Sequence, residues 1–549
     1  LLVVSMVGDD PAVDPFQVSR EVVALARRRL PPTLAMHAAG LPLVEGSIAE
    51  LVAGERTTIV PLLLAVLLGV AWSLYRSLWL ATAVVLPAVV AIAWTGGVVA
   101  WLGHPLDPVA ALLDPVLLTI GVAASVHFVE GFLRGRADAL STAAALAAAK
   151  ERLRRPAFWA TTTTMLGLLS LTANDTPAVA DFGLRAALGV ALTHLFTFRL
   201  LPAYLARVAG APVPAIAAGA LRSGATWVGR LRATRPVTLA LAAAAIALAA
   251  AGLPRIETGN DPLLLLPEDH VVRRDYDVLA ARLGGVETCH LLIDHDSSAT
   301  APERLLPFLA EVRVGEVTAG LAGPVRRGVE GDLAVPLLLR PSGSTTRARC
   351  FAAIERSARV LGLDGVIVAG RSVRIARDSV ALIRGLLRSL SLSLVVLTVA
   401  MAIALRSWRL GLAAMVPSVL PSLWLYGGLG CLVRPLSVAT AMIGCTMLGL
   451  IVDNTLHLLH HLKDARASGC DAATALIRAF DRCGRAIALS TVVLMAGFLT
   501  ATCSRLSTTV EFGLLASVTI AMAWFGTAVL LPTVLLRDRA PAEGGDGAR

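Results

Sequence analysis

The segment from Gly449 to His461, with the sequence GLIVDNTLHLLHH, holds the residues best suited to proton chemistry in this chain. Asp453 and His457 are four residues apart, so on a helix they share one face, and His460 or His461 follows one turn later. A carboxylate in an apolar helix is costly unless it is paired, faces a cavity or carries a proton. We therefore expect a proton site at Asp453, relayed by His457, with His460 and His461 at the membrane interface.

Neighbouring polar residues could extend this proton relay. Asn454 directly follows the acid, and Ser490 and Thr491 lie together in another apolar run. Hydroxyl groups in such runs bond either to a neighbouring helix or to their own backbone, so packing competes with a relay role. The alternative for Asp453 itself is a structural residue held by hydrogen bonds.

The chain aligns with itself without a gap in the register that places Gly40 on Gly370, called here the repeat register. The same register matches Arg76 with Arg406, Pro87 with Pro417, Pro105 with Pro435, His127 with His457, Gly167 with Gly497, and Phe182-Gly183 with Phe512-Gly513. Repeats of this length, built from apolar runs, are typical of transporters made of two parallel halves. We therefore expect the function to lie between the halves.

The first half carries His127 but lacks the acid of the second half. Ala123 occupies the position that matches Asp453. Asp114, which precedes Ala123 in the same apolar run, and Glu130, one turn after His127, are candidate substitute ionisable groups, although each could also be an ordinary helix-end contact.

Two basic side chains lie in the run that begins at residue 182. Arg185 and His194 match Leu515 and Trp524, which are uncharged, in the second half. One of them could neutralise an acid across the interface between the halves. The alternative is that they extend toward the membrane surface.

Composition identifies an integral membrane protein, because 56% of the residues are hydrophobic and only 16% are charged. Eleven apolar runs reach the roughly 17 to 25 residues that cross a bilayer: 59–75, 77–102, 109–129, 157–173, 182–206, 237–254, 389–405, 410–433, 436–462, 486–503 and 512–536. The span at 237–254 has no partner in the repeat, and the chain opens on Leu1. We therefore expect a truncated N-terminus that lacks one span.

Lys and Arg are concentrated in the loops after residues 129 and 462, which the positive-inside rule places in the cytoplasm. The segments that we expect are a remnant of a first exported (porter) domain at 1–58, a five-span bundle at 59–206, a cytoplasmic linker at 207–236, the first span of the second half at 237–254, a second porter domain at 255–385, a second five-span bundle at 386–536 and a cytoplasmic tail at 537–549. The net charge of +10 then reflects insertion and contact with anionic lipid rather than nucleic acid.

The exported segment at 255–385 is expected to be α/β. Strands are predicted at 288–294, 333–339 and 366–369, a helix at 345–360, and a further helix that runs into the span at 389. The remnant repeats the order, with strands at 1–6 and 33–37, a helix at 14–28, and a helix from Pro42 into the next span. Both segments would therefore hold a βαβ-like module. Cys289 and Cys350 share the second one, where a disulfide is permitted.

Several chemistries lack a sequence basis in this chain. It has no Walker A, HExxH, GxSxG or CxxC sequence, so we expect neither an enzyme nor a resident metal or cofactor.

The motifs together resemble the resistance-nodulation-division (RND) superfamily, and within it the MMPL-type or hydrophobe-exporter branch. The resemblance rests on GLIVDN, on TTTTMLGLLSL, DFGLRAALG and FRLLPAYL in the first half, and on STVVLMAGFLTA, EFGLLASVTI and LLPTVLL in the second. The stretch that begins GNDPLLLLPEDH resembles the entry to the second porter domain. The family acid motif matches at Gly449 and Asp453, whereas Asn454 replaces the usual aromatic residue.

The resemblance implies a polytopic α-helical protein with two pseudo-repeated bundles, the first sterol-sensing-like, and ferredoxin-like porter domains outside a bacterial inner membrane. It implies proton-driven export of lipids or other hydrophobic molecules, with a homo-oligomer as a further option. Because Ala123 removes the usual second carboxylate, a non-pumping lipid receptor or scaffold is the main alternative. A protein-translocation auxiliary is a third.

Overall fold

The computed structural model describes residues 15–31, 33–103, 109–208, 224–256, 259, 261–293, 308, 317–322, 325–327, 333–340, 342–361, 365–432 and 436–536. The chain forms two compact units. The first, called here the α/β unit, comprises Leu1–Gly54, Glu257–Ile383 and Arg505–Thr508. The second, called here the helical unit, comprises Glu55–Ile256, Arg384–Ser504 and Thr509–Arg549.

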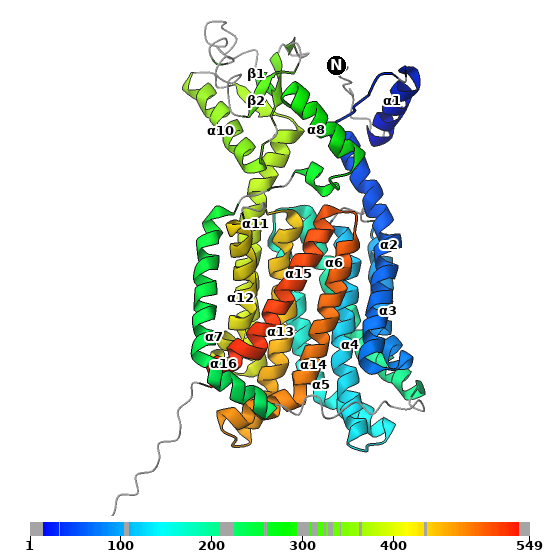
Figure 1. The fold of residues 1–549 in the computed structure, drawn as a ribbon, viewed down its shortest axis with the longest axis vertical. Helices are drawn as coiled ribbons and strands as arrows, with labels where there is room; N and C mark the ends of the chain where they lie inside the picture. The colour runs from blue at the N-terminus through cyan, green and yellow to red at the C-terminus, as the bar shows by residue number, and fades with distance from the viewer. Residues whose placement is uncertain are drawn as a thin grey trace, which may run out of the picture. The chain divides into compact units, whose positions relative to one another are not determined.

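The helical unit is a bundle of long helices that lie side by side (Figure 1). Their bounds are α2 (Leu41–Tyr75), α3 (Leu78–Trp101), α4 (Leu113–Ala137), α5 (Thr142–Leu169), α6 (Pro177–Val208), α7 (Gly224–Gly252), α11 (Arg371–Leu405), α12 (Trp408–Cys431), α13 (Val438–Ala467), α14 (Ala472–Thr500), α15 (Ser507–Phe525) and α16 (Leu531–Leu535). A π-helical turn, Gly526–Leu530, joins α15 to α16. As predicted, α2 and α11 are each one unbroken helix that continues from a segment of the α/β unit into a predicted span.

Ten helices in the described part of the chain are long and apolar enough to cross a membrane. The prediction of eleven spans differs at 157–173, because the helix that covers this run, α5, is not among the ten. Its N-terminal half carries Lys150, Glu151, Arg152, Arg154 and Arg155, so the apolar part of the α-helix is only residues 157–169. The α5 helix nevertheless packs inside the bundle, as its contacts with α13 show below.

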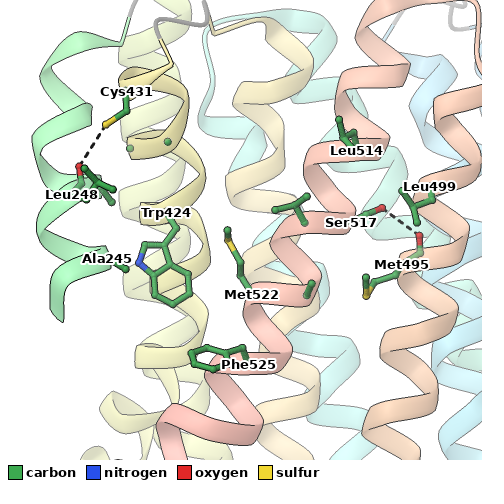
Figure 2. A pocket seen from close by; sticks show the side chains of 15 residues that line it. Ala245, Leu248, Trp424, Cys431, Met495, Leu499, Leu514, Ser517, Met522 and Phe525 are labelled. Atoms are coloured by element: carbon green, nitrogen blue, oxygen red, sulfur yellow. Dashed lines mark hydrogen bonds between the residues drawn. The ribbon is translucent and has the colours of Figure 1, made fainter. Parts of the chain in front are cut away.

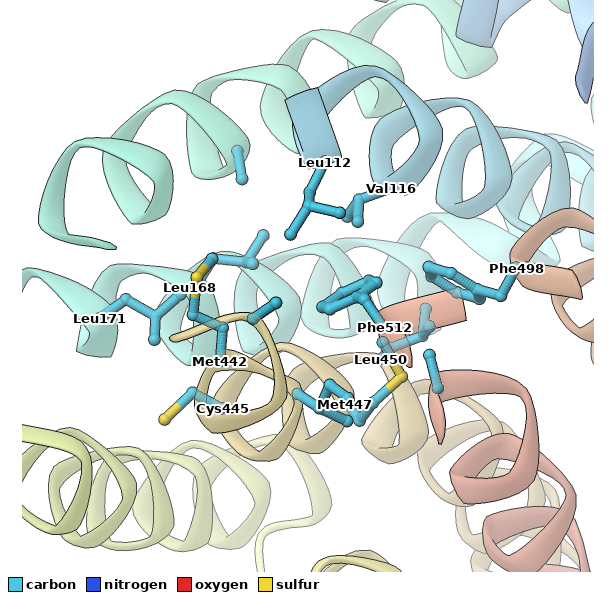
Figure 3. Packing of buried hydrophobic residues seen from close by; sticks show 14 of the residues in the cluster. Leu112, Val116, Leu168, Leu171, Met442, Cys445, Met447, Leu450, Phe498 and Phe512 are labelled. Atoms are coloured by element: carbon cyan, nitrogen blue, oxygen red, sulfur yellow. The ribbon is translucent and has the colours of Figure 1, made fainter. Parts of the chain in front are cut away.

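Buried apolar clusters hold the helical unit together, and one of them draws on helices from both predicted halves. Figure 3 shows part of it, with Leu168 of α5, Met442 and Leu450 of α13, Phe498 of α14 and Phe512 of α15 around a common centre. Phe182, which matches Phe512 in the repeat register, belongs to the same cluster. Dispersion contacts of this kind, rather than exclusion from water, hold helices together in lipid.

Several local geometries recur at positions that match in the repeat register. Arg76 and Arg406 both adopt a left-handed backbone conformation between two helices, with φ of 51° and 48°. Two buried hydroxyl pairs follow the same register: Ser125 with Thr197 at 3.5 Å, and Thr455 with Thr527 at 3.0 Å. The predicted match of Pro105 with Pro435 lies outside the described residues.

The α/β unit contains an antiparallel sheet with the strand order β2-β4-β1-β5, and β3 pairs with β4. The strands are β1 (Glu287–Ile293), β2 (Thr318–Leu321), β3 (Arg326–Arg327), β4 (Leu333–Leu339) and β5 (Val366–Ala369), and the helices are α1 (Pro15–Arg29), α8 (Val271–Leu283) and α10 (Ser344–Val360). The predicted strands are present, although residue 294 lies outside the described range. Because β1 is antiparallel to both β4 and β5, the module β4-α10-β5 is a βαβ unit with β1 inserted.

Alternation along the strands builds the core of this sheet. Cys289, Leu291 and Ile293 of β1 point to one face and are buried against apolar residues of α10, including Phe351 and Ile354. No disulfide joins Cys289 to Cys350 in the described part of the chain, so the permitted disulfide is not formed. Burial raises the pKa of the Cys289 thiol to about 12, which keeps it protonated and unreactive.

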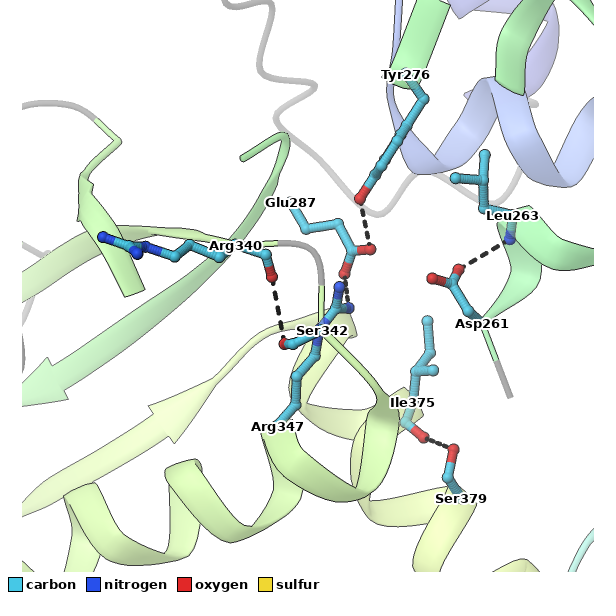
Figure 4. Close-up of polar contacts among 9 residues, drawn as sticks. All are labelled: Asp261, Leu263, Tyr276, Glu287, Arg340, Ser342, Arg347, Ile375 and Ser379. Atoms are coloured by element: carbon cyan, nitrogen blue, oxygen red, sulfur yellow. Dashed lines mark hydrogen bonds and ion pairs between the residues drawn. The ribbon is translucent and has the colours of Figure 1, made fainter. Parts of the chain in front are cut away.

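A buried charge pair joins β1 to α10 (Figure 4). Arg347 Nη1 donates to Glu287 Oε2 at 2.6 Å, and Tyr276 donates to the other carboxylate oxygen at 2.9 Å. Asp261, which accepts a hydrogen bond from the backbone of Leu263 at 2.9 Å, lies beside this pair. Burial, reinforced by the charge of Glu287, raises the pKa of Asp261.

The segment at 1–58 differs from its prediction. The predicted helix at 14–28 is present as α1, but the strand predicted at 33–37 is wrong. His37 Nδ1 lies 2.7 Å from Asp275 Oδ1, and the backbone N–H of Ala38 donates to Asp275 Oδ2 at 3.2 Å. A side chain of α8 therefore holds this segment instead of a neighbouring strand. The strand predicted at 1–6 lies outside the described residues.

Candidate functional site

The acid predicted as a proton site lies on the most enclosed helix of the bundle. Of the apolar window of α13, 94% is buried inside the protein, and α4 follows with 83%. His457 Nε2 lies 3.3 Å from Asp453 Oδ1, as expected for residues four apart on one helix face. This oxygen has no aligned hydrogen bond in the described part of the chain.

The first half contributes His127 of α4 to the same point. The rings of His127 and His457 are stacked, with centroids 4.5 Å apart and planes inclined by 7°. These two residues match in the repeat register, so equivalent positions of the two predicted halves meet face to face. His127 is buried, and its Nε2 atom has no hydrogen-bond partner among the described residues. We call Asp453, His457 and His127 the His-Asp cluster.

The two polar neighbours of the acid behave differently from each other. Ser490 of α14 lies with its hydroxyl 3.2 Å from Asn454 Oδ1, which ties α14 to α13 beside the cluster. Thr491 instead donates to the backbone carbonyl of Ile487 in its own helix at 2.7 Å. The Ser490 hydroxyl also lies 3.0 Å from the carbonyl of Ile487, so it is shared between its own helix and the predicted relay, whereas the hydroxyl of Thr491 is occupied only within its own helix.

Glycine allows α5 and α13 to approach each other one turn from the cluster. A Cβ atom on Gly167 would lie only 2.9 Å from the Cα of Gly449, so a larger residue would force the two backbones apart. Thr164, one turn from Gly167, donates to the carbonyl of Gly449 at 3.0 Å across the same contact. These contacts fix the position of α13 relative to α5, and with it the position of Asp453.

The other predicted glycines also stand at close helix contacts. A Cβ atom on Gly183 would lie 2.5 Å from the carbonyl oxygen of Leu168, and one on Gly513 would lie 2.4 Å from that of Phe498. Gly497 faces Thr119 of α4.

The His-Asp cluster can exchange protons, because it combines one carboxylate with two imidazoles. In the low-dielectric interior each proton gained or lost changes the local charge strongly. The three donor atoms lie within 4.8 Å of one another, a spacing at which a small metal ion could also be held.

The substitute acids predicted in the first half lie on either side of the cluster. Asp114 pairs with Arg56 of α2 at 3.0 Å, within the first half. Glu130 lies 3.4 Å from Arg485 of α14 and therefore pairs across the two predicted halves. Its other oxygen, Oε1, is buried and has no partner among the described residues.

The two basic candidates on α6 do not reach an acid of the other half. Arg185 pairs with Asp181, four residues earlier on its own helix, at 3.1 Å. His194 Nδ1 lies 2.8 Å from the hydroxyl of Thr161 on α5. Near the C-terminal end of α13, His460 Nε2 is 3.8 Å from Asp464, and His461 Nδ1 is buried without a partner in the described residues.

Sequence reasoning missed a buried acid, Glu55 of α2. It is only 6% exposed and accepts hydrogen bonds from the hydroxyls of Ser504 and Thr509 near the start of α15. Because Glu55 precedes the predicted span at residue 59 and adjoins Arg56, it reads in the sequence as part of a charged flank. The helix predicted from Pro42 into the next span already places Glu55 in mid-helix, and this is the signal that could have identified it; the structure shows this helix as the 35-residue α2.

An apolar groove of about 710 Å³ lies between α7, α12, α14 and α15 (Figure 2). Its walls include Leu248, Trp424, Gly428, Met495, Leu499 and Phe525. The hydroxyl of Ser517 is engaged by the carbonyl of Gly513 at 2.7 Å, so the lining offers almost only apolar surface. Leu248 and Leu499 are largely exposed beside it, which leaves the groove open to its surroundings.

Comparisons with known proteins agree with this architecture. A sequence model of the MMPL family matches residues 1–239 and 335–537. The membrane protein MJ1562 of Methanocaldococcus jannaschii is 28% identical over 120 residues, which are 22% of this chain and 31% of that protein. SecDF from Thermus thermophilus, a translocon-associated membrane protein, has a TM-score of 0.61 at 16% identity, over 91% of this chain and 63% of that one. The chain thus spans less than two thirds of each relative, and the likeness to SecDF is one of fold.

Proposed function

The chain belongs to the MMPL family of multi-pass membrane proteins in the RND superfamily, and from this premise we propose that it is a proton-driven exporter of lipids or other hydrophobic molecules. The observation that carries the proposal is the His-Asp cluster, in which the two most enclosed spans, α4 and α13, meet through ionisable side chains. Ionisable groups at such a depth are costly and are kept where they serve transport.

Proton binding at Asp453 would change the contact between the halves. The deprotonated carboxylate attracts a protonated His457, and protonation of the carboxylate removes that attraction. The stacked imidazoles of His457 and His127 repel each other when both are charged, so the cluster favours different packings of α4 and α13 in different protonation states. Alternation between these packings is the coupling step that we propose.

The absence of a carboxylate at position 123 is compatible with this step. His127 lies at the position equivalent to His457 and supplies an ionisable group from the first half directly beside Asp453. Asn454 and Ser490 extend the polar contact to α14. We therefore assign the proton relay to the His-Asp cluster with Asn454 and Ser490.

We further propose that the protein has two paired halves. We take the recurrences in the repeat register as a duplicated bundle with pseudo-twofold symmetry. We take the sheet order of the α/β unit, with its inserted β1 strand, as that of a ferredoxin-like porter domain, and 1–58 as the remnant of its twin. From the basic loops we infer that these domains lie on the periplasmic or outer side of a bacterial inner membrane.

The apolar groove supports a hydrophobic substrate. Its volume lies within the range of ligand pockets, and its open side is formed by spans that face lipid. We propose that an acyl chain of the substrate enters the helical unit from the bilayer at this groove.

Two alternatives follow from particular observations. The lone carboxylate of the His-Asp cluster favours a non-pumping, sterol-sensing-like lipid receptor or scaffold. The likeness of fold to a translocon-associated protein favours an auxiliary in protein translocation. Only the exporter requires that the flux of a hydrophobic molecule depend on the pH gradient.

The test is an Asp453→Asn variant in liposomes that contain a trapped pH indicator. An asparagine keeps the shape of the side chain but cannot be protonated. We expect it to abolish both dissipation of an imposed pH gradient and gradient-dependent movement of a fluorescently labelled phospholipid. Asp464→Asn is the matched control, because Asp464 lies on the same helix but is about half exposed.

The control should transport at the rate of the wild-type protein. Wild-type rates in Asp453→Asn would remove the proton-site assignment. Lipid binding without any gradient-dependent flux in the wild-type protein would favour the receptor.

A further inference from the structure

A cationic pocket lies between α5 and α6, away from the His-Asp cluster. The pocket, of about 410 Å³, is lined by Lys150, Arg154, Arg155, Phe158, Trp159, His194, Phe198 and Arg199. Four of these side chains are permanently charged, and all four are exposed. The nearest acid recorded for any of them is Glu151, 3.9 Å from Arg154. Lys150, Arg155 and Arg199 have no acidic partner in the part of the chain that the structure describes.

Helical spacing separates the charges of this pocket from its aromatic rings. Along α5, Lys150 and Arg154 precede Phe158 and Trp159, and the rise from Lys150 to Trp159 corresponds to roughly 13 Å of helix. The α6 helix runs antiparallel to α5, so Arg199, which follows Phe198, lies toward the same end of the pocket as Lys150 and Arg154. The pocket is thus cationic toward the proposed cytoplasmic surface and aromatic toward the membrane interior.

The aromatic wall of the pocket is held in place by specific contacts. His194 is tied to α5 through Thr161 at 2.8 Å. Its ring lies 4.7 Å from that of Phe198, and the ring of Phe158 lies 5.8 Å from that of Trp159. These contacts fix the aromatic side of a two-part site.

The repeat supplies an internal comparison. In the repeat register, Lys150, Arg154 and Arg199 match Phe480, Gly484 and Val529. The matching helices of the second half therefore fold without these three charges. Of the four pocket cations only Arg155 has a cation at its matching position, Arg485, which is neutralised by Glu130 at 3.4 Å.

We propose that this pocket binds an anionic glycerophospholipid of the cytoplasmic leaflet, with its phosphate on the cations and an acyl chain along the aromatic rings. Arg and Lys clusters at the cytoplasmic membrane surface attract anionic head groups, and guanidinium groups bind phosphate through paired hydrogen bonds. Aromatic side chains are favourable at the level of the head groups. The assignment rests on the proposed orientation of the bundle but not on proton coupling.

The experiment is native mass spectrometry of the purified full chain with palmitoyl-oleoyl-phosphatidylglycerol or the matching phosphatidylcholine. The triple variant Lys150→Gln, Arg154→Gln and Arg199→Gln should lose retained phosphatidylglycerol by about tenfold or more relative to the wild-type protein. A control with Arg409→Gln, Arg478→Gln and Arg482→Gln removes the same charge from exposed positions at the same proposed end of the bundle and should bind within about twofold of wild type.

Equal retention by the triple variant and the wild type would overturn the site, as would an equal loss in the control. Displacement of the lipid by millimolar inorganic phosphate would show that the pocket binds a free anion and not a lipid. Because the readout is binding, Asp453→Asn should retain the lipid fully, so failure of the lipid site and failure of the proton site are separate results.

Discussion

Replacement of Gly167 by alanine tests whether the contact between α5 and α13 positions the proton site. The added Cβ would lie 2.9 Å from the Cα of Gly449 and 3.1 Å from its nitrogen. Both are backbone atoms, which cannot rotate away. The two helices must therefore separate locally until the shorter distance, 2.9 Å, reaches the 3.4 Å at which ordinary contact begins.

That separation has two consequences of known size. Overpacking of this kind costs about 1–3 kcal/mol. It also stretches the bond from Thr164 to the carbonyl of Gly449 from 3.0 Å toward the limit of a hydrogen bond, which costs at most about 1 kcal/mol more, because the same hydroxyl can still donate to the carbonyl of Ala160 at 3.0 Å. Because Asp453 lies one turn beyond Gly449, the shift moves the acid relative to His127, and a displacement of this size should slow proton flux on the order of tenfold.

Thermal unfolding in detergent and proton flux in liposomes would measure the two effects of Gly167→Ala. Gly97→Ala is the matched control, because a Cβ there meets nothing within 4 Å and the helix should be slightly stabilised. Thr164→Val removes the hydrogen bond without adding bulk and should show only the smaller loss of stability. If Gly167→Ala unfolds and conducts protons like the Gly97→Ala control, the close contact does not position the acid.

Three further outcomes follow from the structure. Gly428→Phe should narrow the apolar groove, because Gly428 lines it and a Cβ there meets nothing within 4 Å, and should slow labelled-lipid movement. An unchanged rate would place lipid entry elsewhere. Arg347→Met should weaken the α/β unit by about 1–3 kcal/mol, because it leaves the partly buried Glu287 without its cation, and Arg347→Met with Glu287→Leu should recover part of the loss in hydrogen exchange of β1. Since the pKa of Asp261 is raised in the folded state, folding binds a proton there, so the stability of the unit should fall as pH rises from about 4 through that raised pKa. Asp261→Asn should remove this slope in hydrogen exchange measured across the range, and a slope unchanged by the substitution would assign the proton to another group.

The sequence alone determined the elements whose signal is local. Long apolar runs predicted the spans, and short runs of strand-forming residues predicted β1, β4 and β5, because both signals lie in neighbouring residues. The stripe of Asp453 and His457 followed from the helical period, since residues four apart share a helix face. The span predicted at 157–173 is not among the ten helices that are long and apolar enough, because the first half of α5 carries several charges. The helix nevertheless packs inside the bundle.

The predictions that failed concern contacts made by side chains. The segment at 33–37 was predicted as a strand, yet a carboxylate of α8 binds the His37 side chain and the backbone N–H of Ala38, and no partner strand is present in the described residues. Arg185 was a candidate to cross the interface between the halves, but an acid on its own helix, Asp181, lies closer.

Only the tertiary structure decided which ionisable groups meet. The stacking of His127 on His457, the pair of Glu130 with Arg485 and the burial of Glu55 each join residues that are far apart in the sequence. Periodicity fixes the face on which a side chain lies, but not the helix that this face touches. Which helices pack together depends on how closely their backbones can approach. Here the contact of Gly167 with Gly449, two residues without side chains, allows α5 and α13 to pack closely and so positions Asp453.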